Sequence, residues 1–138
     1  MSRIFLFCLI VFCSCRKEEK KGDRLPEFLD SYPERKFDNL LFLYLDGCTS
    51  CQEFQELLYQ EALLDNDYQI FLVTNSPKKA RLMFGLLPEE KVFFDGNLRA
   101  LDFGLISGFP VVYQKDQSGN YSKVEISFDQ VHLGLPNP

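Results

Sequence analysis

The segment LLFLYLDGCTSCQEFQELL, residues 40–58, joins six apolar residues to two cysteines that lie three positions apart. The apolar run Leu40–Leu45 is short and continuous, which is typical of a strand covered on both faces in a parallel sheet. From residue 49 onward the apolar residues recur at intervals of three and four, which predicts an amphipathic helix over residues 49–64. The segment therefore predicts a buried strand that leads through Cys48 into a helix carrying Cys51.

The rest of the chain alternates strands with helices and ends in a hairpin. Ser76 is placed to cap a helix that begins at Pro77, and the residues DQSGN at 116–120 predict a hairpin turn. In chain order the expected elements are a short helix at 25–32, a strand at 40–45, a helix at 49–64, a strand at 68–73, a helix at 77–86, a short apolar run at 92–94, a short helix at 97–105, and strands at 110–115 and 121–128. This order predicts an α/β domain with a mixed sheet.

Length and charge limit the classes of function. The chain has 138 residues, of which 46% are hydrophobic and 14% aromatic, which fits one compact domain. Fifteen Lys and Arg against twenty Asp and Glu give a net charge of −5, which offers no basic surface for a phosphate backbone. We therefore expect one folded domain at residues 37–138 and no nucleic-acid partner.

Residues 1–15, MSRIFLFCLIVFCSC, have the pattern of a signal peptide. Arg3 precedes ten apolar residues, 4–13, about half the length needed to cross a bilayer. The final Ser14-Cys15 resembles the lipobox of bacterial lipoproteins, in which this cysteine is acylated and becomes the new N-terminus. The resemblance implies an exported lipoprotein, anchored to a membrane through Cys15 and facing the periplasm. Because Phe12 stands where Leu is usual, plain secretion and an uncleaved anchor remain alternatives.

Residues 16–36 are expected to form a charged tether and a short helix. The run RKEEKKGDR at 16–24 contains no apolar residue, which is typical of a solvated linker. Its first four residues also resemble a signal that sends some lipoproteins to the outer cell surface. The cell surface is therefore a second expected location.

The position of the two cysteines suggests a division of roles. Cys48 is expected at the start of the helix, where unpaired backbone N–H groups and the helix dipole stabilise a thiolate. In such a setting a thiol pKa falls from about 8.5 to between about 3.5 and 7.5. Cys51 lies one turn deeper, which suits a resolving thiol. Thr49 and Ser50 tune the couple through hydrogen bonds to the Cys48 sulfur, or are ordinary polar residues of the first turn.

The same spacing is half of many zinc sites. A structural zinc ion needs four ligands, and the chain adds only His132, far away in the sequence. No metal site is therefore predicted, although two soft thiolates leave copper(I) as an alternative.

The chain resembles the thioredoxin superfamily, and more narrowly its exported, membrane-tethered reductases. The resemblance rests on the strand Leu40–Leu45 that feeds the CTSC motif at 48–51, and on SGFPVVYQKDQSGNY at 107–121. It implies a thioredoxin-like mixed central sheet flanked by helices. It also implies a cis peptide bond before Pro110, which with Phe109 would hold an extended substrate segment beside the nucleophile.

The chain departs from this family at two places. Gly47 stands where the family often has Trp, and Phe42 stands where thioredoxins carry a buried Asp that helps deprotonate the second thiol. The nearest acids in the sequence, Asp46 and Glu53, are expected on the solvated surface. Deprotonation of Cys51 therefore requires water or another group.

The predicted function is thiol–disulfide exchange on exported proteins. The partners are protein thiols and disulfides, and the resemblance implies a reductant that is recharged by a membrane electron donor. No cofactor is expected besides the redox-active disulfide Cys48–Cys51. The alternative is a redox-inactive thioredoxin-fold binding protein or a copper(I) carrier.

Overall fold

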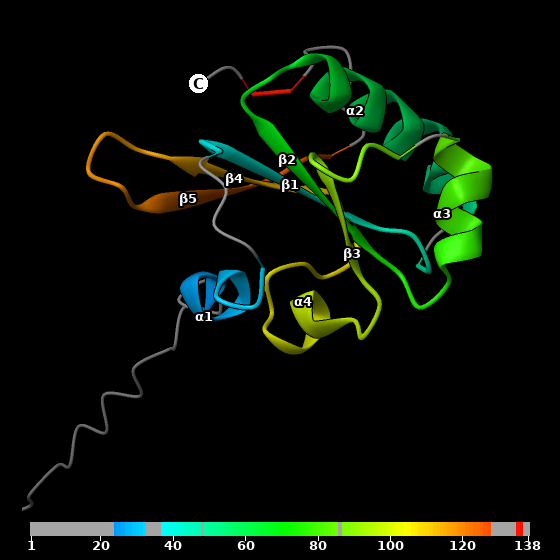
Figure 1. Cartoon of the computed structure of the whole chain (residues 1–138), viewed down its shortest axis with the longest axis horizontal. Helices are drawn as coiled ribbons and strands as arrows, with labels where there is room; N and C mark the ends of the chain where they lie inside the picture. The colour runs from blue at the N-terminus through cyan, green and yellow to red at the C-terminus, as the bar shows by residue number, and fades with distance from the viewer. Residues whose placement is uncertain (1–23, 33–36, 48, 86, 128–134, 137–138) are drawn as a thin grey trace, which may run out of the picture.

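The computed structural model of the protein describes residues 24–32, 37–47, 49–85, 87–127 and 135–136. The elements in chain order are α1 (Leu25–Leu29), β1 (Asn39–Tyr44), the 3₁₀ turn η1 (Thr49–Cys51), α2 (Gln52–Leu64), β2 (Tyr68–Val73), α3 (Pro77–Phe84), β3 (Val92–Asp95), α4 (Arg99–Asp102), β4 (Val111–Lys115) and β5 (Tyr121–Glu125). The predicted α/β class, with a mixed central sheet flanked by helices, is confirmed (Figure 1).

The five strands form one sheet in the order β3-β2-β1-β4-β5. Strands β1, β2 and β3 run parallel, whereas β4 is antiparallel to β1 and β5 is antiparallel to β4. The three parallel strands therefore end at the edge where β4 begins. We call this the loop edge of the sheet, because it gathers the segments that follow β1, β2 and β3 and the segment that enters β4.

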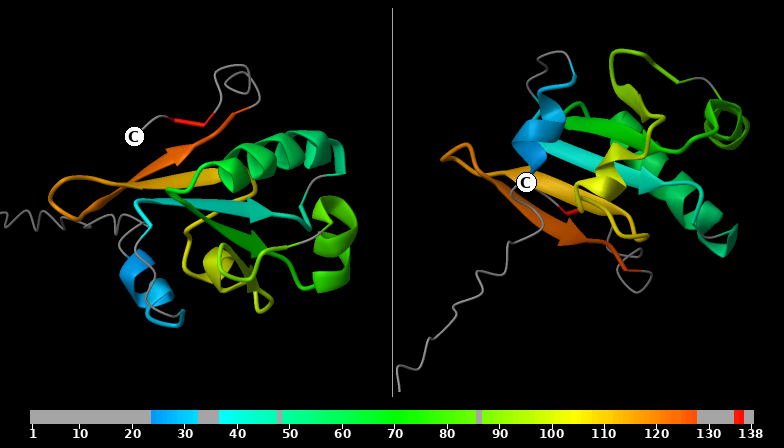
Figure 2. Two further views of the ribbon diagram at one scale, coloured as in Figure 1. Left: turned by 45° about the horizontal axis from the view of Figure 1, so that its top comes forward. Right: turned by 90° about the horizontal axis from the view of Figure 1, so that it is seen from below.

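Helices cover both faces of the sheet, with α2 and α3 on one face and α1 and α4 on the other (Figures 1 and 2). Successive residues of β1 point to opposite faces. Leu41 and Leu43 join the hydrophobic cluster beneath α2 and α3, while Leu40 and Phe42 join the cluster beneath α1 and α4. This is why the β1 sequence is apolar throughout.

The N-terminal helix α1 is part of the packed unit. Leu25 and Phe28 are buried, and the Phe28 ring centroid lies 5.5 Å from those of both Phe42 and Phe71. The guanidinium of Arg24 lies 3.9 Å from the ring centroid of Phe103. The short helix that we expected beside the tether therefore closes one face of the sheet.

Several elements lie where short motifs in the sequence predicted them. Strand β2 has the predicted bounds, and α3 begins at Pro77 with Ser76 as its cap, the Ser76 Oγ accepting a hydrogen bond of 3.3 Å from the Lys79 N–H. The hairpin between β4 and β5 turns at Gly119, which has φ +86°. Glycine adopts this left-handed conformation without steric cost.

Several predicted elements need correction. The helices expected over 25–32 and 77–86 end at Leu29 and Phe84, and the strand expected over 121–128 ends at Glu125. The helix expected over 49–64 starts as the 3₁₀ turn η1 and becomes α-helical at Gln52. The apolar run at 92–94 is an edge strand of the sheet, β3. The helix expected over 97–105 shrinks to one turn, because Leu98 at φ +56° precedes it and Asp95 accepts hydrogen bonds from the N–H groups of Arg99 and Ala100.

The predicted signal peptide, Cys15 and the charged run up to residue 23 lie outside the described residues, as does His132. The anchor and the export signal stay predictions. Within the ranges that the structure describes, no helix has both the length and the apolar character that crossing a membrane requires.

Candidate functional site

Cys51 lies at the loop edge, where the chain leaves β1 and enters α2. It is the last residue of η1 and the N-cap of α2, and its side chain is 7% exposed. The backbone of Thr49 opens η1, and Ser50 is exposed. Cys48 lies outside the described residues. The predicted resolving cysteine is thus buried at the start of the helix, as its position in the CTSC motif suggested.

Gln55 ties the start of α2 to the end of β1. Its side chain is 1% exposed, and its Nε2 donates a hydrogen bond of 2.8 Å to the backbone oxygen of Tyr44. Because Gln55 follows Cys51 by four residues, both side chains lie on the same face of the helix. The sequence analysis missed this residue, although a glutamine on the apolar face of an amphipathic helix was the available signal.

Asp46 holds the loop before the cysteines against the next parallel strand. Its Oδ1 accepts from the Thr74 hydroxyl at 3.0 Å, and its Oδ2 accepts from the Asn75 N–H at 3.0 Å. The Lys79 ammonium lies 3.6 Å from Oδ1 and donates to the Leu45 carbonyl at 2.5 Å. The expectation that Asp46 is a solvated surface acid is therefore wrong, because both of its oxygens bind the β2–α3 connection.

The Tyr44 ring lies against Gly47. A Cβ atom at Gly47 would approach the Tyr44 Cδ1 and Cε1 atoms to 2.9 Å, which is closer than non-bonded carbon atoms pack. A side chain at Gly47, where the resembling family often has Trp, would have to displace this ring. The Tyr44 ring thus occupies the space that a side chain at Gly47 would need.

Phe109 and Pro110 are brought to the same edge as Cys51. Val111 of β4 lies opposite Phe42 of β1, and continuing this antiparallel register places Pro110 and Phe109 beside the last residues of β1. Pro110 is buried, and its carbonyl accepts a hydrogen bond of 2.9 Å from the Ile126 N–H. Phe109 is 49% exposed, so it offers an apolar surface at the loop edge.

The expected cis peptide bond before Pro110 is wrong. The described residues contain no cis peptide bond, so the Phe109–Pro110 bond is trans, the form that X–Pro bonds favour by default. Two residues before Pro110, Gly108 has a φ of +138°. That conformation is open to glycine and strained for other residues.

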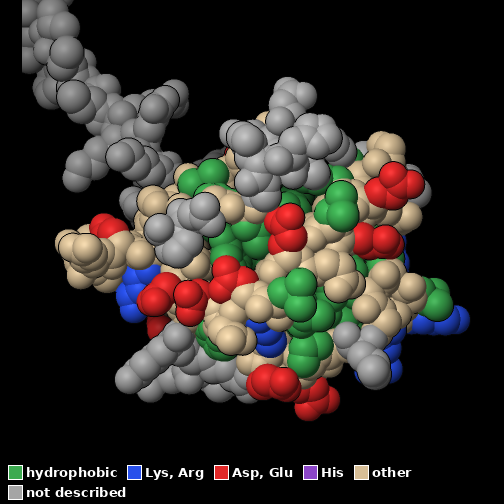
Figure 3. Space-filling model, turned by 90° about the horizontal axis from the view of Figure 1, so that it is seen from above, with side chains coloured by type: hydrophobic (Ala, Val, Ile, Leu, Met, Phe, Trp, Pro, Cys, Tyr) green, Lys and Arg blue, Asp and Glu red, His purple; other side chains and the backbone are tan. Residues whose placement is uncertain are grey.

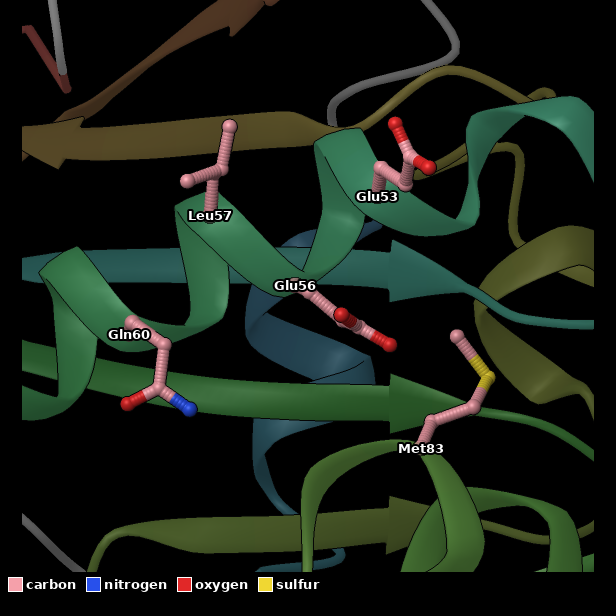
Figure 4. A pocket seen from close by; sticks show the side chains of 5 residues that line it. All are labelled: Glu53, Glu56, Leu57, Gln60 and Met83. Carbon is pink, nitrogen blue, oxygen red and sulfur yellow. The ribbon is translucent and has the colours of Figure 1, made fainter.

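Glu53 lies on the outer side of α2, as expected for a surface acid. It borders an open groove of about 380 Å³ between α2 and α3, which is lined by Glu53, Glu56, Leu57, Gln60 and Met83. Figure 4 shows the Glu56 and Met83 side chains pointing toward one another from the two helices. Acidic and apolar side chains are interspersed over this face of the molecule (Figure 3).

Among the residues that the structure describes, no group of three or more His, Cys, Asp or Glu side chains is arranged to hold a metal ion. A copper(I) site of two thiolates would need Cys48, which lies outside those residues. It stays an alternative.

No protein-family model matches this chain, and no curated protein matches it. Among solved structures, the chain is similar to a Chlorobium tepidum protein described as a thiol:disulfide interchange protein DsbE, with a TM-score of 0.46 and 18% identity over 69% of this chain and 72% of that one. It is also similar to MTB DsbF in its mixed oxidized and reduced forms, with a TM-score of 0.45 and 17% identity over 70% of this chain and 75% of that one. At this overlap and identity, function has to be inferred from the chain's own residues.

Proposed function

We propose that this chain is a thioredoxin-like protein that performs thiol–disulfide exchange through Cys48 and Cys51. The observation that carries the proposal is the burial of Cys51 at the start of α2, directly after the central strand β1. Half-exposed Phe109 and buried Pro110 enter β4 at the same edge. A sheltered thiol and an exposed apolar side chain at the same edge of the sheet suit a site that captures a protein disulfide and then releases it.

In the proposed reaction the Cys48 thiolate attacks one sulfur of a substrate disulfide. A Cys48–substrate disulfide forms, and the other substrate sulfur leaves as a thiolate. The Cys51 thiolate then attacks the Cys48 sulfur, which forms the Cys48–Cys51 disulfide and frees the second substrate thiolate. Burial of Cys51 favours this order, because a bulky protein substrate reaches an exposed thiol more easily than a buried one.

Other residues at this edge are proposed to assist. Thr49 and Ser50 would tune the Cys48 thiolate through hydrogen bonds, and Phe109 with Pro110 would hold an extended substrate segment. Exposure of Phe109 and Ser50 supports contact with a partner. Because the Phe109–Pro110 bond is trans, we propose that Pro110 supports the substrate segment through its buried ring at the start of β4 and not through a cis turn.

The direction of exchange depends on the potential of the couple relative to its compartment, since about 30 mV shifts the balance by about 1.4 kcal/mol. We propose that the protein is exported, is anchored through Cys15 to a membrane with the domain facing the periplasm or the cell surface, and acts as a reductant. The sequence pattern of residues 1–15 supports export. A membrane electron donor would then regenerate the dithiol.

The test is a redox titration combined with reduction of insulin disulfides, using the wild type, Cys48→Ser and Cys51→Ser. We expect the wild type to reduce insulin. Cys51→Ser should trap a mixed disulfide with the substrate, and Cys48→Ser should trap none. If Cys51→Ser traps nothing and the reduced wild type instead takes up one copper(I) ion tightly, the binding-protein alternative replaces the exchange proposal.

A further inference from the structure

Gln55, one helical turn after the resolving cysteine, has a buried side-chain oxygen that lacks a hydrogen-bond partner among the described residues. The Tyr44 carbonyl can only accept, so the Gln55 amide must turn its NH₂ group toward it. This fixes the amide orientation and directs Oε1 elsewhere. Oε1 is buried and makes no hydrogen bond to the described protein atoms. Long side chains on a helix lean toward its N-terminus, which for Gln55 is the side of Cys51.

A buried amide oxygen left without a partner costs free energy, and native proteins rarely keep one. Buried water is the usual partner, and it needs further polar groups to bind. The Cys51 thiol, one turn away on the same helix face and also buried, is such a group. A water molecule beside the Gln55 Oε1 would give this oxygen a partner, and the lean of the side chain toward the helix N-terminus would set that water on the side of Cys51.

We propose that Gln55 is a positioning residue for the resolving step: its Oε1 holds a water molecule beside Cys51, and this water takes the thiol proton. This inference rests on the proposed exchange function. The S–H bond of Cys51 breaks, and the proton passes to the water and then to bulk solvent or to the leaving thiolate. The Cys51 sulfur forms a bond to the Cys48 sulfur, and the Cys48–substrate bond breaks with its electron pair on the substrate sulfur.

The acids nearest to the CTSC motif in the sequence are poorly placed for this task, and Phe42 occupies the position of the resembling family's buried acid. Phe42 belongs to the hydrophobic cluster under α1 and α4, on the face of the sheet opposite α2. Both oxygens of Asp46 bind the β2–α3 connection, and Glu53 is exposed on the outer side of α2. Gln55 is the buried polar residue of α2 that lies nearest to Cys51 along the helix.

The test follows the two steps separately with the aromatic disulfide DTNB. It uses the full reduced chain with Cys8, Cys13 and Cys15 replaced by Ser, so that Cys48 and Cys51 are the remaining thiols. The first coloured thiolate appears when Cys48 attacks, and the second appears when Cys51 resolves the mixed disulfide.

In Gln55→Met, a variant of similar length, we expect the second release to slow by about tenfold at neutral pH. Its pH midpoint should also rise, because apolar surroundings disfavour a thiolate. The first release should not change. Among the described residues, the ionisable side chains of the segments that meet at this end of α2 include Tyr44, Asp46, Glu53 and Lys79, and the substitution leaves all of them in place.

Gln69→Met is the matched control. Gln69 is also buried, its Nε2 donates to the Lys91 carbonyl at 2.7 Å, and its Oε1 also lacks a partner. It lies near the start of β2, at the end of the sheet away from the loop edge. We expect Gln69→Met to leave the rate and the pH midpoint of the second release unchanged.

A wild type that shows no second release would refute the exchange function itself. A wild type that resolves normally, with Gln55→Met behaving identically or slowing both releases equally, would overturn only the role of Gln55. If Gln55→Met does not fold, Gln55→Glu tests the role of Gln55 in the resolving step instead. A carboxyl group that takes the proton itself should shift the pH midpoint of the second release by about one unit, and an unchanged profile would overturn the inference.

Discussion

The bond between Asp46 and Thr74 should stabilise the fold measurably, because it joins the loop before the cysteines to the segment after β2. Thr74 is fully buried and Asp46 is partly exposed, and the hydroxyl donates to the carboxylate at 3.0 Å. The perturbation is a double-mutant cycle with Asp46→Ala, Thr74→Val and both changes together. The cycle is needed because each single change removes more than this bond.

The magnitude follows from the contacts. A hydrogen bond to a charged group contributes about 1.5–3 kcal/mol, and the partial exposure of Asp46 argues for the lower end, so we expect a coupling of about 1.5 kcal/mol. Asp46→Ala also loses the Asn75 contact and the partly exposed ion pair with Lys79. Its total cost should be about 2–4 kcal/mol. Thr74→Val also loses the bond that the hydroxyl accepts from the Ser76 N–H at 3.0 Å.

Urea unfolding of the reduced protein, followed by far-ultraviolet circular dichroism, measures these free energies, since the chain contains no Trp to serve as a fluorescent probe. The control cycle pairs Thr74→Val with Asp116→Ala. The Asp116 carboxylate accepts from two N–H groups in the distant β4–β5 turn, so these two changes should be additive. A coupling below about 0.5 kcal/mol between Asp46 and Thr74 would refute the stabilising role of the bond.

Three further predictions use the same unfolding assay. Phe42→Ala should lower the free energy of unfolding by about 3–5 kcal/mol, because the ring is fully buried and stacks on Phe71 at a centroid distance of 4.7 Å; a loss below about 1 kcal/mol would contradict this packing. Lys91→Met should cost about 1–2 kcal/mol, since the Lys91 ammonium donates to two carbonyls at the C-terminal end of α2, and an unchanged urea midpoint would argue against that cap. Burial raises the pKa of Tyr32 and Tyr68 to about 12, whereas unfolded tyrosine titrates near about 10. The stability that comes from keeping these two tyrosines neutral is therefore present below pH 10 and is lost as the pH rises from about 10 toward 12. Absorbance at 295 nm should follow their ionisation, and the urea midpoint should fall over the same pH range.

Elements with strong local signals could be predicted from the sequence. Strand β2 is a mostly apolar run, with Gln69 as its one polar residue, between polar residues, and the pair Ser76-Pro77 specifies a helix start through a cap and a fixed φ. The position of Cys51 on the first turn followed from the change of period after Leu45. These features depend on residues that are close together in the sequence, so a single sequence is enough to predict them.

Features that depend on distant contacts could not be predicted in this way. The role of Asp46 arises from a hydroxyl 28 positions later in the chain, and the polar contact of Gln55 is with a carbonyl 11 positions earlier. Strand β3 has four residues and owes its place to pairing with β2. The cis bond at Pro110 was predicted from the family resemblance rather than from the chain's own residues, and it too was wrong.

The packing of α1 against the sheet shortens the segment that would connect a lipid anchor to the folded domain. Because Arg24, Leu25 and Phe28 already pack with the hydrophobic cluster beneath α1 and α4, only residues 16–23 would separate the folded unit from an acylated Cys15. A random-coil segment of that length has an end-to-end distance of roughly 16 Å. A protein held so close to the headgroups would meet mainly those clients that are themselves translocating across, or resident at, the same membrane.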